Sequence, residues 1–146
     1  MNDESSTRST HDEVSIEIPA QPNYLSFARL IVGALATDID LTIDEIEDLY
    51  LAVDELCLTL LRNVLDDSSR LRIVVKWSPD QVHVRCQVAL RPDGSEATPD
   101  LTLLESPTAI SELILDALVD EHGVTTGVHE ITAWLRKYRR PLSPSG

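Results

Sequence analysis

The chain has 146 residues, 42% of them hydrophobic and 25% charged, so it can form one domain with a core of its own. Its net charge is -13, from 25 acidic and 12 basic residues, which argues against a nucleic-acid-binding surface of clustered bases. No apolar run approaches the ~20 residues that cross a bilayer, and the acidic N-terminus lacks the apolar core of a secretory signal. We therefore expect a cytoplasmic protein with no membrane partner and no direct nucleic-acid partner.

The two ends are expected to stay outside the folded domain. Residues 1–12 contain no apolar side chain after Met1 and predict a disordered arm, and residues 141–146 predict a disordered tail. Residues 13–140 then form a single domain. Within it, the alternation of Val14, Ile16 and Ile18 with polar residues predicts a half-buried strand that ends at Pro19.

Pro22 is a favourable first residue for a helix that fades near Thr37. Arg29 falls outside the apolar stripe of this helix. The residues expected to be buried recur at intervals of three and four: Tyr24, Phe27, Leu30, Ile31, Ala34 and Leu35.

A second and longer helix is announced by a capping box, in which Thr42 precedes Glu45 by three residues. It is expected to run to about Asp66. Its predicted buried stripe consists of Ile46, Leu49, Val53, Leu56, Leu60 and Val64.

The rest of the chain predicts strands around a third helix. Residues 71–77 and 82–88 read as an antiparallel pair, and residues 91–106 as a loop. Pro107 opens the helix, Gly123 is its expected C-cap, and residues 124–137 form one or two closing strands. This order predicts an α+β fold with two layers, helices on one face of a mostly antiparallel sheet. The apolar stripe of the third helix is Ile110, Leu113, Ile114, Ala117 and Leu118.

No metal site is expected, because the four histidines lack the spacing of metal ligands. Cys57 and Cys86 both fall at apolar positions and are expected to be buried free thiols rather than a disulfide. The acidic residues are unevenly placed, with eight acids and no base between Asp38 and Glu55. This run is either a solvated helix face or a docking surface for a basic partner.

Three segments resemble a known family: Ser26-Phe27-Ala28-Arg29, the sequence DEIEDL at 44–49 and LAVDELC at 51–57. They are similar to the anti-sigma factors of the RsbW and SpoIIAB type, and in particular to the actinobacterial UsfX-like form. The resemblance implies the GHKL, or histidine-kinase-like ATPase, fold. It implies a protein that binds an alternative sigma factor, is released by an anti-anti-sigma protein of the STAS type, and forms homodimers. Kinase members of the family use Mg-ATP to phosphorylate that competitor.

The nucleotide motifs of the family are only partly present. Its N-box is E-x-x-x-N, and here Glu55 is followed at that spacing by Thr59. The adenine-binding motif D-x-G-x-G is reduced to Asp93-Gly94, and the glycine-rich lid step is replaced by Ala109-Ile110-Ser111-Glu112. Glu112 would place a carboxylate beside the phosphates. If a pocket persists, Glu55, Thr59, Asp93 and Gly94 are its residues, with Glu55 as the catalytic carboxylate.

The partner-binding residues implied by the resemblance are better preserved. Arg29 matches the arginine that the family places at the partner interface, and its alternative role is a local pair with a helix acid. Asp44, Glu45 and Asp48 are candidates to meet the basic surface of a sigma factor. The leading hypothesis is a non-catalytic anti-sigma factor. The alternatives are an active serine/threonine-protein kinase that depends on Glu55, and an adaptor of the same fold with another target.

Overall fold

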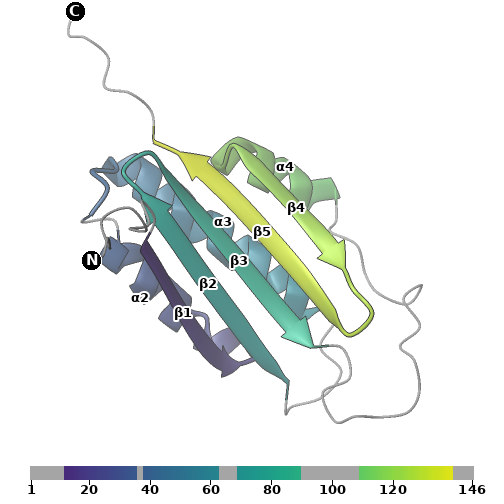
Figure 1. Ribbon diagram of the computed structural model, residues 1–146. Helices are drawn as coiled ribbons and strands as arrows, with labels where there is room; N and C mark the ends of the chain where they lie inside the picture. The colour runs from purple at the N-terminus through teal and green to yellow at the C-terminus, as the bar shows by residue number, and fades with distance from the viewer. Residues whose placement is uncertain (1–11, 36–37, 63–68, 90–108, 140–146) are drawn as a thin grey trace, which may run out of the picture.

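The computed structural model describes residues 12–35, 38–62, 69–89 and 109–139. Figure 1 shows one sheet with helices packed behind it. The elements are β1 (Asp12–Pro19), η1 (Pro22–Tyr24), α2 (Ser26–Leu35), α3 (Ile43–Leu61), β2 (Arg70–Ser78), β3 (Gln81–Ala89), α4 (Ala109–Leu118), β4 (Glu121–Thr126) and β5 (Glu130–Tyr138). Apart from Asp12, with which β1 begins, the predicted arm and tail lie outside the described residues, so those predictions stay open.

The strands form a five-stranded sheet in the order β1-β2-β3-β5-β4, and every neighbouring pair is antiparallel. The predicted closing segment consists of two strands, of which β4 begins at Glu121. Gly123 is not a helix cap as expected, because α4 already ends at Leu118. It lies opposite Trp134, where a Cβ atom would come within 2.9 Å of the indole Nε1. Glycine is therefore required here by the close approach of a side chain rather than by a turn.

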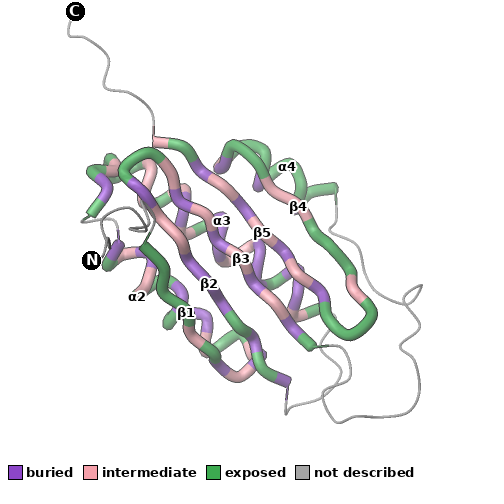
Figure 2. The backbone as a smooth tube through the Cα atoms, viewed as in Figure 1, coloured by how far each residue is buried: buried purple, intermediate pink, exposed green. Residues whose placement is uncertain are grey.

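Helices α2, α3 and α4 cover one face of the sheet, which confirms the predicted two-layer α+β architecture (Figure 1). In Figure 2 the central strands alternate between buried and less buried residues, as expected for a sheet with one covered face. The core lies between the two layers. Its largest fully buried side chains are Leu49, Leu56, Leu60, Leu71, Ile73, Leu135, Val32, Val53, Val75, Val82 and Val84.

The capping box of α3 is formed as predicted. The Glu45 amide donates to Thr42 Oγ1 at 3.1 Å, and the Thr42 amide donates to Glu45 Oε1 at 2.8 Å. Most of the predicted stripe is buried, since Leu49, Val53 and Leu56 are nearly inaccessible. The helix ends at Leu61, and the predicted extension to Asp66 falls outside the described residues.

Helix α2 begins later than predicted, because Pro22 opens the 3-10 turn η1 and the α-helix starts at Ser26. Its predicted buried stripe is only partly correct: Leu35 is buried and Tyr24 and Ile31 pack against the core, but two other members are exposed. Phe27 is 48% exposed and Leu30 67% exposed. The residues that α2 buries are Ala28, Val32 and Leu35.

Helix α4 departs from its predicted stripe in a similar way, although Leu118 packs against the core as expected. Ile110 and Leu113 are largely exposed, whereas Ser111 and Leu115 are buried. Both helices carry apolar side chains on two faces, so the stronger stripe does not identify the face that meets the sheet. The outer surface of the helical layer is consequently rich in large apolar side chains. None of the described helices is long and apolar enough to cross a membrane.

Candidate functional site

Arg29 is held by an acid of the neighbouring helix. Its Nε donates to both carboxylate oxygens of Asp54, at 3.2 and 3.1 Å, and its Nη2 also contacts that carboxylate. This hydrogen bonding and the negative charge of Asp54 raise the pKa of Arg29. The arginine side chain remains 55% exposed and Asp54 only 18% exposed. Arg29 therefore has an intramolecular partner and still presents its guanidinium to solvent.

The three predicted partner acids on α3 differ in their surroundings. Glu45 is part of the capping box, and Asp48 lies 3.9 Å from the ammonium of Lys137. Lys137 is buried and donates to the carbonyl of Leu118 at 2.8 Å, where it caps the C-terminal end of α4. Asp44 is exposed in the first turn of α3. Asp44 is thus the one of the three most open to a partner.

Glu55 points to α4 rather than to open solvent. The hydroxyl of Ser111, in the first turn of α4, donates to Glu55 Oε2. Arg62 Nη2 lies 3.9 Å from the same oxygen. The carboxylate that the resemblance assigns to catalysis is therefore an interhelical contact. Sequence analysis missed this role of Ser111, because the two residues are 56 positions apart and form no local motif.

Thr59 is buried beside Glu55, one helical turn further along α3. Its hydroxyl donates to the carbonyl of Glu55 at 2.9 Å, a bond between residues four apart in the helix. The hydroxyl proton is thus directed to the backbone of its own helix. The structure brings Glu55 and Thr59 together as predicted, whereas Asp93 and Gly94 lie outside the described residues.

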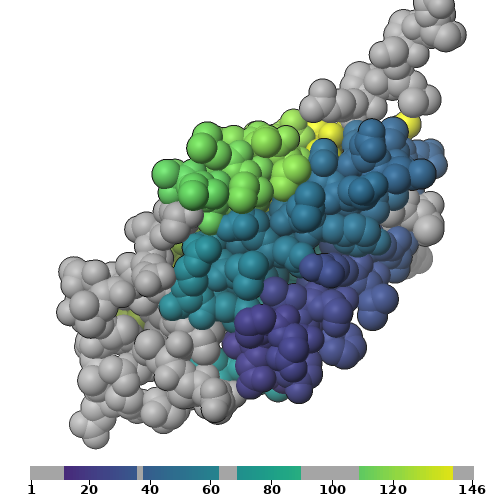
Figure 3. Space-filling model, turned by 180° about the vertical axis from the view of Figure 1, so that it is seen from behind, coloured from purple at the N-terminus to yellow at the C-terminus, as the bar shows by residue number. Residues whose placement is uncertain are grey.

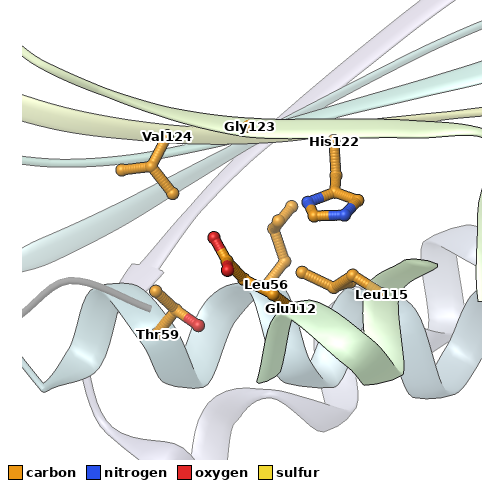
Figure 4. A pocket seen from close by; sticks show the side chains of 7 residues that line it. All are labelled: Leu56, Thr59, Glu112, Leu115, His122, Gly123 and Val124. Atoms are coloured by element: carbon orange, nitrogen blue, oxygen red, sulfur yellow. The ribbon is translucent and has the colours of Figure 1, made fainter. Parts of the chain in front are cut away.

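A cavity of about 300 Å³ lies between α3, α4 and β4, lined in part by Thr59 and Glu112 (Figure 4). Figure 4 shows the carboxylate of Glu112 directed into this space from α4, with His122 and Val124 on the strand side. The ring of His122 is 2.6 Å from Asp116 and is therefore engaged with an acid of α4. The remaining lining residues are Leu56, Leu115 and Gly123.

The described part of this cavity does not fit Mg-ATP. The N-box amide is replaced by a buried threonine whose hydroxyl donates to the backbone. Glu112 adds a negative charge on the side where the resemblance implies the phosphates. The described lining combines apolar side chains with Thr59, Glu112 and His122.

Known proteins resemble this chain in sequence and in structure. An anti-sigma-F factor RsbW of Mycobacterium tuberculosis is 35% identical over 108 residues, 74% of this chain and 58% of that protein. A serine-protein kinase RsbW of Bacillus velezensis is 25% identical over 138 residues, 87% of this chain and 86% of that protein. The crystal structure of the RsbU and RsbW domains of an M. tuberculosis protein matches with a TM-score of 0.56 and 18% identity. That match covers 89% of this chain and 33% of the solved chain. No protein-family model matches.

In sequence, the chain is similar to RsbW proteins of both kinds, those named anti-sigma-F factor and those named serine-protein kinase. Its fold is similar to that of the solved structure, which contains an RsbW domain, as the resemblance implied. The chain spans 58% of the length of the M. tuberculosis relatives. Of the residues assigned to the nucleotide, Glu55 and Thr59 are engaged in contacts within the helical layer. Arg29, assigned to the partner, lies on the outer surface of that layer.

Proposed function

We propose that this chain is a non-catalytic anti-sigma factor. It binds an alternative RNA polymerase sigma factor in a stoichiometric complex and keeps it from the polymerase. It acts in the cytoplasm, where transcription takes place. The observation that carries this proposal is the apolar outer surface of α2 and α3 around the Arg29–Asp54 pair.

This surface has the composition of a protein interface. Phe27 and Leu30 project from α2, and Leu51 and Leu58 project from α3 on either side of Asp54 in the sequence. Exposed large apolar side chains around a charged pair are typical of interface cores, in which arginine is enriched. Figure 3 views the molecule from the helical side, with α4 in green, α3 in blue and the N-terminal elements in purple. We assign this side to the partner.

The charge of the chain supports a basic partner. The net charge is -13, and Asp44 is exposed at the start of α3. Sigma factors present basic surfaces to DNA and polymerase, so long-range attraction would speed their capture. The capture rate should then fall as salt concentration rises. The M. tuberculosis relatives at 35% identity bear the name anti-sigma-F factor, which agrees with this target class.

A second candidate is an ATP-dependent serine/threonine kinase. The Bacillus relatives are named serine-protein kinases, and Glu55 stands at the N-box position. Against this candidate, Glu55 accepts a hydrogen bond from Ser111 and Glu112 lines the cavity. We therefore place regulation in binding alone. A STAS-type protein would compete for the helical surface, and the chain would act as a homodimer.

The experiment is affinity capture from the lysate of the source organism, with and without Mg-ATP, read by mass spectrometry. The proposal predicts the same sigma factor in both samples in equal amount. Stronger capture with Mg-ATP, together with transfer of labelled γ-phosphate to a STAS protein, would favour the kinase. Absence of any sigma factor, in cells that express one, would contradict the anti-sigma proposal and favour an adaptor.

A further inference from the structure

The face of the sheet that the helices leave uncovered is basic, which the overall charge of the chain does not suggest. Figures 1 and 2 look onto this face. The strand registers place on it residues that alternate with the core residues of β2, β3 and β5. Five of the 12 lysines and arginines of the chain lie there: Arg70, Arg72, Lys76, Arg85 and Arg136.

A shallow depression of about 370 Å³ occupies the part of this face formed by β3, β5 and β4. Its floor includes Trp134, which fits against Gly123 because a side chain there would collide with the indole. The guanidinium carbon of Arg136 is 5.8 Å from the centre of the Trp134 ring, and the ring of His83 is 6.1 Å from it. Arg85 lines the same depression. The pairing of the strands thus places the cations of Arg85 and Arg136 beside the aromatic ring of Trp134.

The positive charge at the centre of this face is not neutralised within the described chain. Glu121 pairs with Arg136 at 2.7 Å, Glu13 with Lys76, and Glu17, which lies opposite Arg72 in the register, with Arg70. Glu130 accepts a hydrogen bond from Gln87. In contrast, no described carboxylate lies within ion-pair distance of Arg72 or Arg85. The Nε atom of Arg85 is buried and has no hydrogen-bond partner among the described residues.

The surroundings of His83 report the same excess of positive charge. Its register neighbours are Lys76 on β2 and Arg136 on β5, and Arg85 lies two residues along β3. Burial, followed by the charges of Arg136, Arg85 and Lys76, lowers the pKa of His83. A bound anion would relieve part of this repulsion.

We propose that the open face of the sheet docks an acidic segment of a partner protein, with carboxylates paired to Arg72 and Arg85 and the peptide lying across Trp134. The planar guanidinium matches a carboxylate through two parallel hydrogen bonds. These two arginines are diagonal neighbours on adjacent strands, so their charges serve carboxylates of one segment. This surface is on the opposite side of the sheet from the helical surface assigned to the sigma factor, so the two can be occupied together.

An acidic peptide fits this face better than a nucleic acid or a second copy of the chain. A nucleic acid would be repelled by the net charge of -13 and by Glu121 and Glu130 beside the depression. A symmetric contact between two copies would bring the same unpaired arginines against each other. A short run of Glu or Asp side chains meets the same net charge, but at the centre of the face its carboxylates can pair with Arg72 and Arg85.

The test is binding of a fluorescent ten-residue polyglutamate peptide to the full chain, measured by anisotropy at low and at physiological ionic strength. We expect binding that weakens with salt, and a loss of about fivefold for Arg85→Gln and for Arg72→Gln. The matched control is Arg62→Gln, which removes one positive charge from the helical layer and should change affinity by less than about twofold. In NMR spectra, the indole N–H of Trp134 should shift on binding, whereas that of Trp77, which donates to Asp38, should not.

Three results would overturn the proposal. The first is an equal loss of peptide affinity in Arg85→Gln and Arg62→Gln. The second is tighter binding of an oligothymidine of ten nucleotides than of the peptide. The third is self-association of the chain that occurs without peptide and protects Trp134. Capture of a sigma factor by Arg85→Gln separates this proposal from the proposed function. Normal capture with lost peptide binding supports two surfaces, and lost capture would place the sigma factor itself on the open face.

Discussion

The guanidinium of Arg29 on α2 donates hydrogen bonds to the carboxylate of Asp54 on α3, and its Nε lies 3.2 and 3.1 Å from the two oxygens. The pair joins two helices at the outer surface of the helical layer, and Arg29 keeps more than half of its side chain exposed. An arginine fixed in this way loses less conformational freedom when a partner binds. The pair therefore prepares Arg29 for an interface in addition to linking the helices.

Exchanging the two charges separates these roles. Arg29→Glu should reduce sigma-factor affinity at least about tenfold, because an interface arginine is lost and two acids come together. In the double variant Arg29→Asp/Asp54→Arg the internal pair is restored. We expect its thermal stability to return to that of the wild type and its sigma-factor affinity to stay low. Full recovery of affinity in the double variant would show that Arg29 acts only within the chain.

The exposed apolar side chains should matter for binding and not for folding. Leu30→Ser removes a side chain that is 67% exposed, so the free energy of unfolding should change by no more than about 0.5 kcal/mol. Sigma-factor affinity should nevertheless fall about tenfold or more. The matched control on the same helix is Leu35→Ala, which empties a core site and should cost about 2–5 kcal/mol of stability. Urea unfolding and isothermal calorimetry measure the two effects, and a marked loss of stability in Leu30→Ser would contradict the assigned face.

The two cysteines are expected to be unreactive in the folded chain. Cys57 and Cys86 are buried free thiols, with their sulfur atoms 3.6 Å apart. The hydrogen bond with Cys57 and burial raise the pKa of Cys86, so the thiolate is disfavoured in the folded state. A thiol reagent at neutral pH should therefore react with both cysteines only after unfolding.

The raised pKa of Cys86 also predicts a lower free energy of unfolding at alkaline pH. The unfolded thiol ionises from about pH 8.5, whereas the folded thiol stays protonated to a higher pH. The free energy of unfolding should be unaffected by Cys86 below that value and decline as pH rises above it. Cys86→Ala should flatten this decline. Rapid labelling of the native protein, or an unchanged alkaline decline in the variant, would contradict the burial of this pair.

The lowered pKa of His83 predicts a loss of stability at acidic pH, in contrast to the alkaline loss predicted for Cys86. Because burial and three neighbouring cations lower its pKa, the folded state resists protonation while the unfolded histidine accepts a proton below about pH 6.5. Its contribution to stability is therefore complete above that pH and is lost as the pH falls. His83→Gln should reduce the difference in urea stability between neutral and mildly acidic buffer. His129→Gln in the β4–β5 turn is the control, and equal effects of the two variants would contradict the proposed field on the open face.

The sequence predicted the order of elements because its signals there are local. Alternation predicted β1 and the β2–β3 hairpin, and the capping box of Thr42 and Glu45 placed the start of α3 correctly. The buried stripe of α3 was also largely correct, since acids such as Glu47 and Asp54 accompany the exposed Leu51 and Leu58 on the opposite face. Contrast between the two faces is what makes a periodicity informative.

The errors occur where that contrast is missing. Helix α2 has apolar residues nearly all round, and the periodicity of Phe27 and Leu30 is as regular as that of Ala28 and Val32. Which stripe faces the sheet is decided by packing between layers, which a single sequence does not contain. The Ser111–Glu55 contact and the basic open face escaped for a related reason, because each joins residues that are distant in the chain.

The central claim is that binding alone silences the sigma factor. The most direct measurement is transcription in vitro by core RNA polymerase with the captured sigma factor. This chain is added in increasing amounts, and the only hydrolysable ATP present is that needed for the transcript. The account predicts that transcription stops near one chain per sigma factor and that Glu55→Gln inhibits as well as the wild type. Transcription that continues with a large excess of the chain, or inhibition that is lost in Glu55→Gln while sigma binding persists, would contradict it.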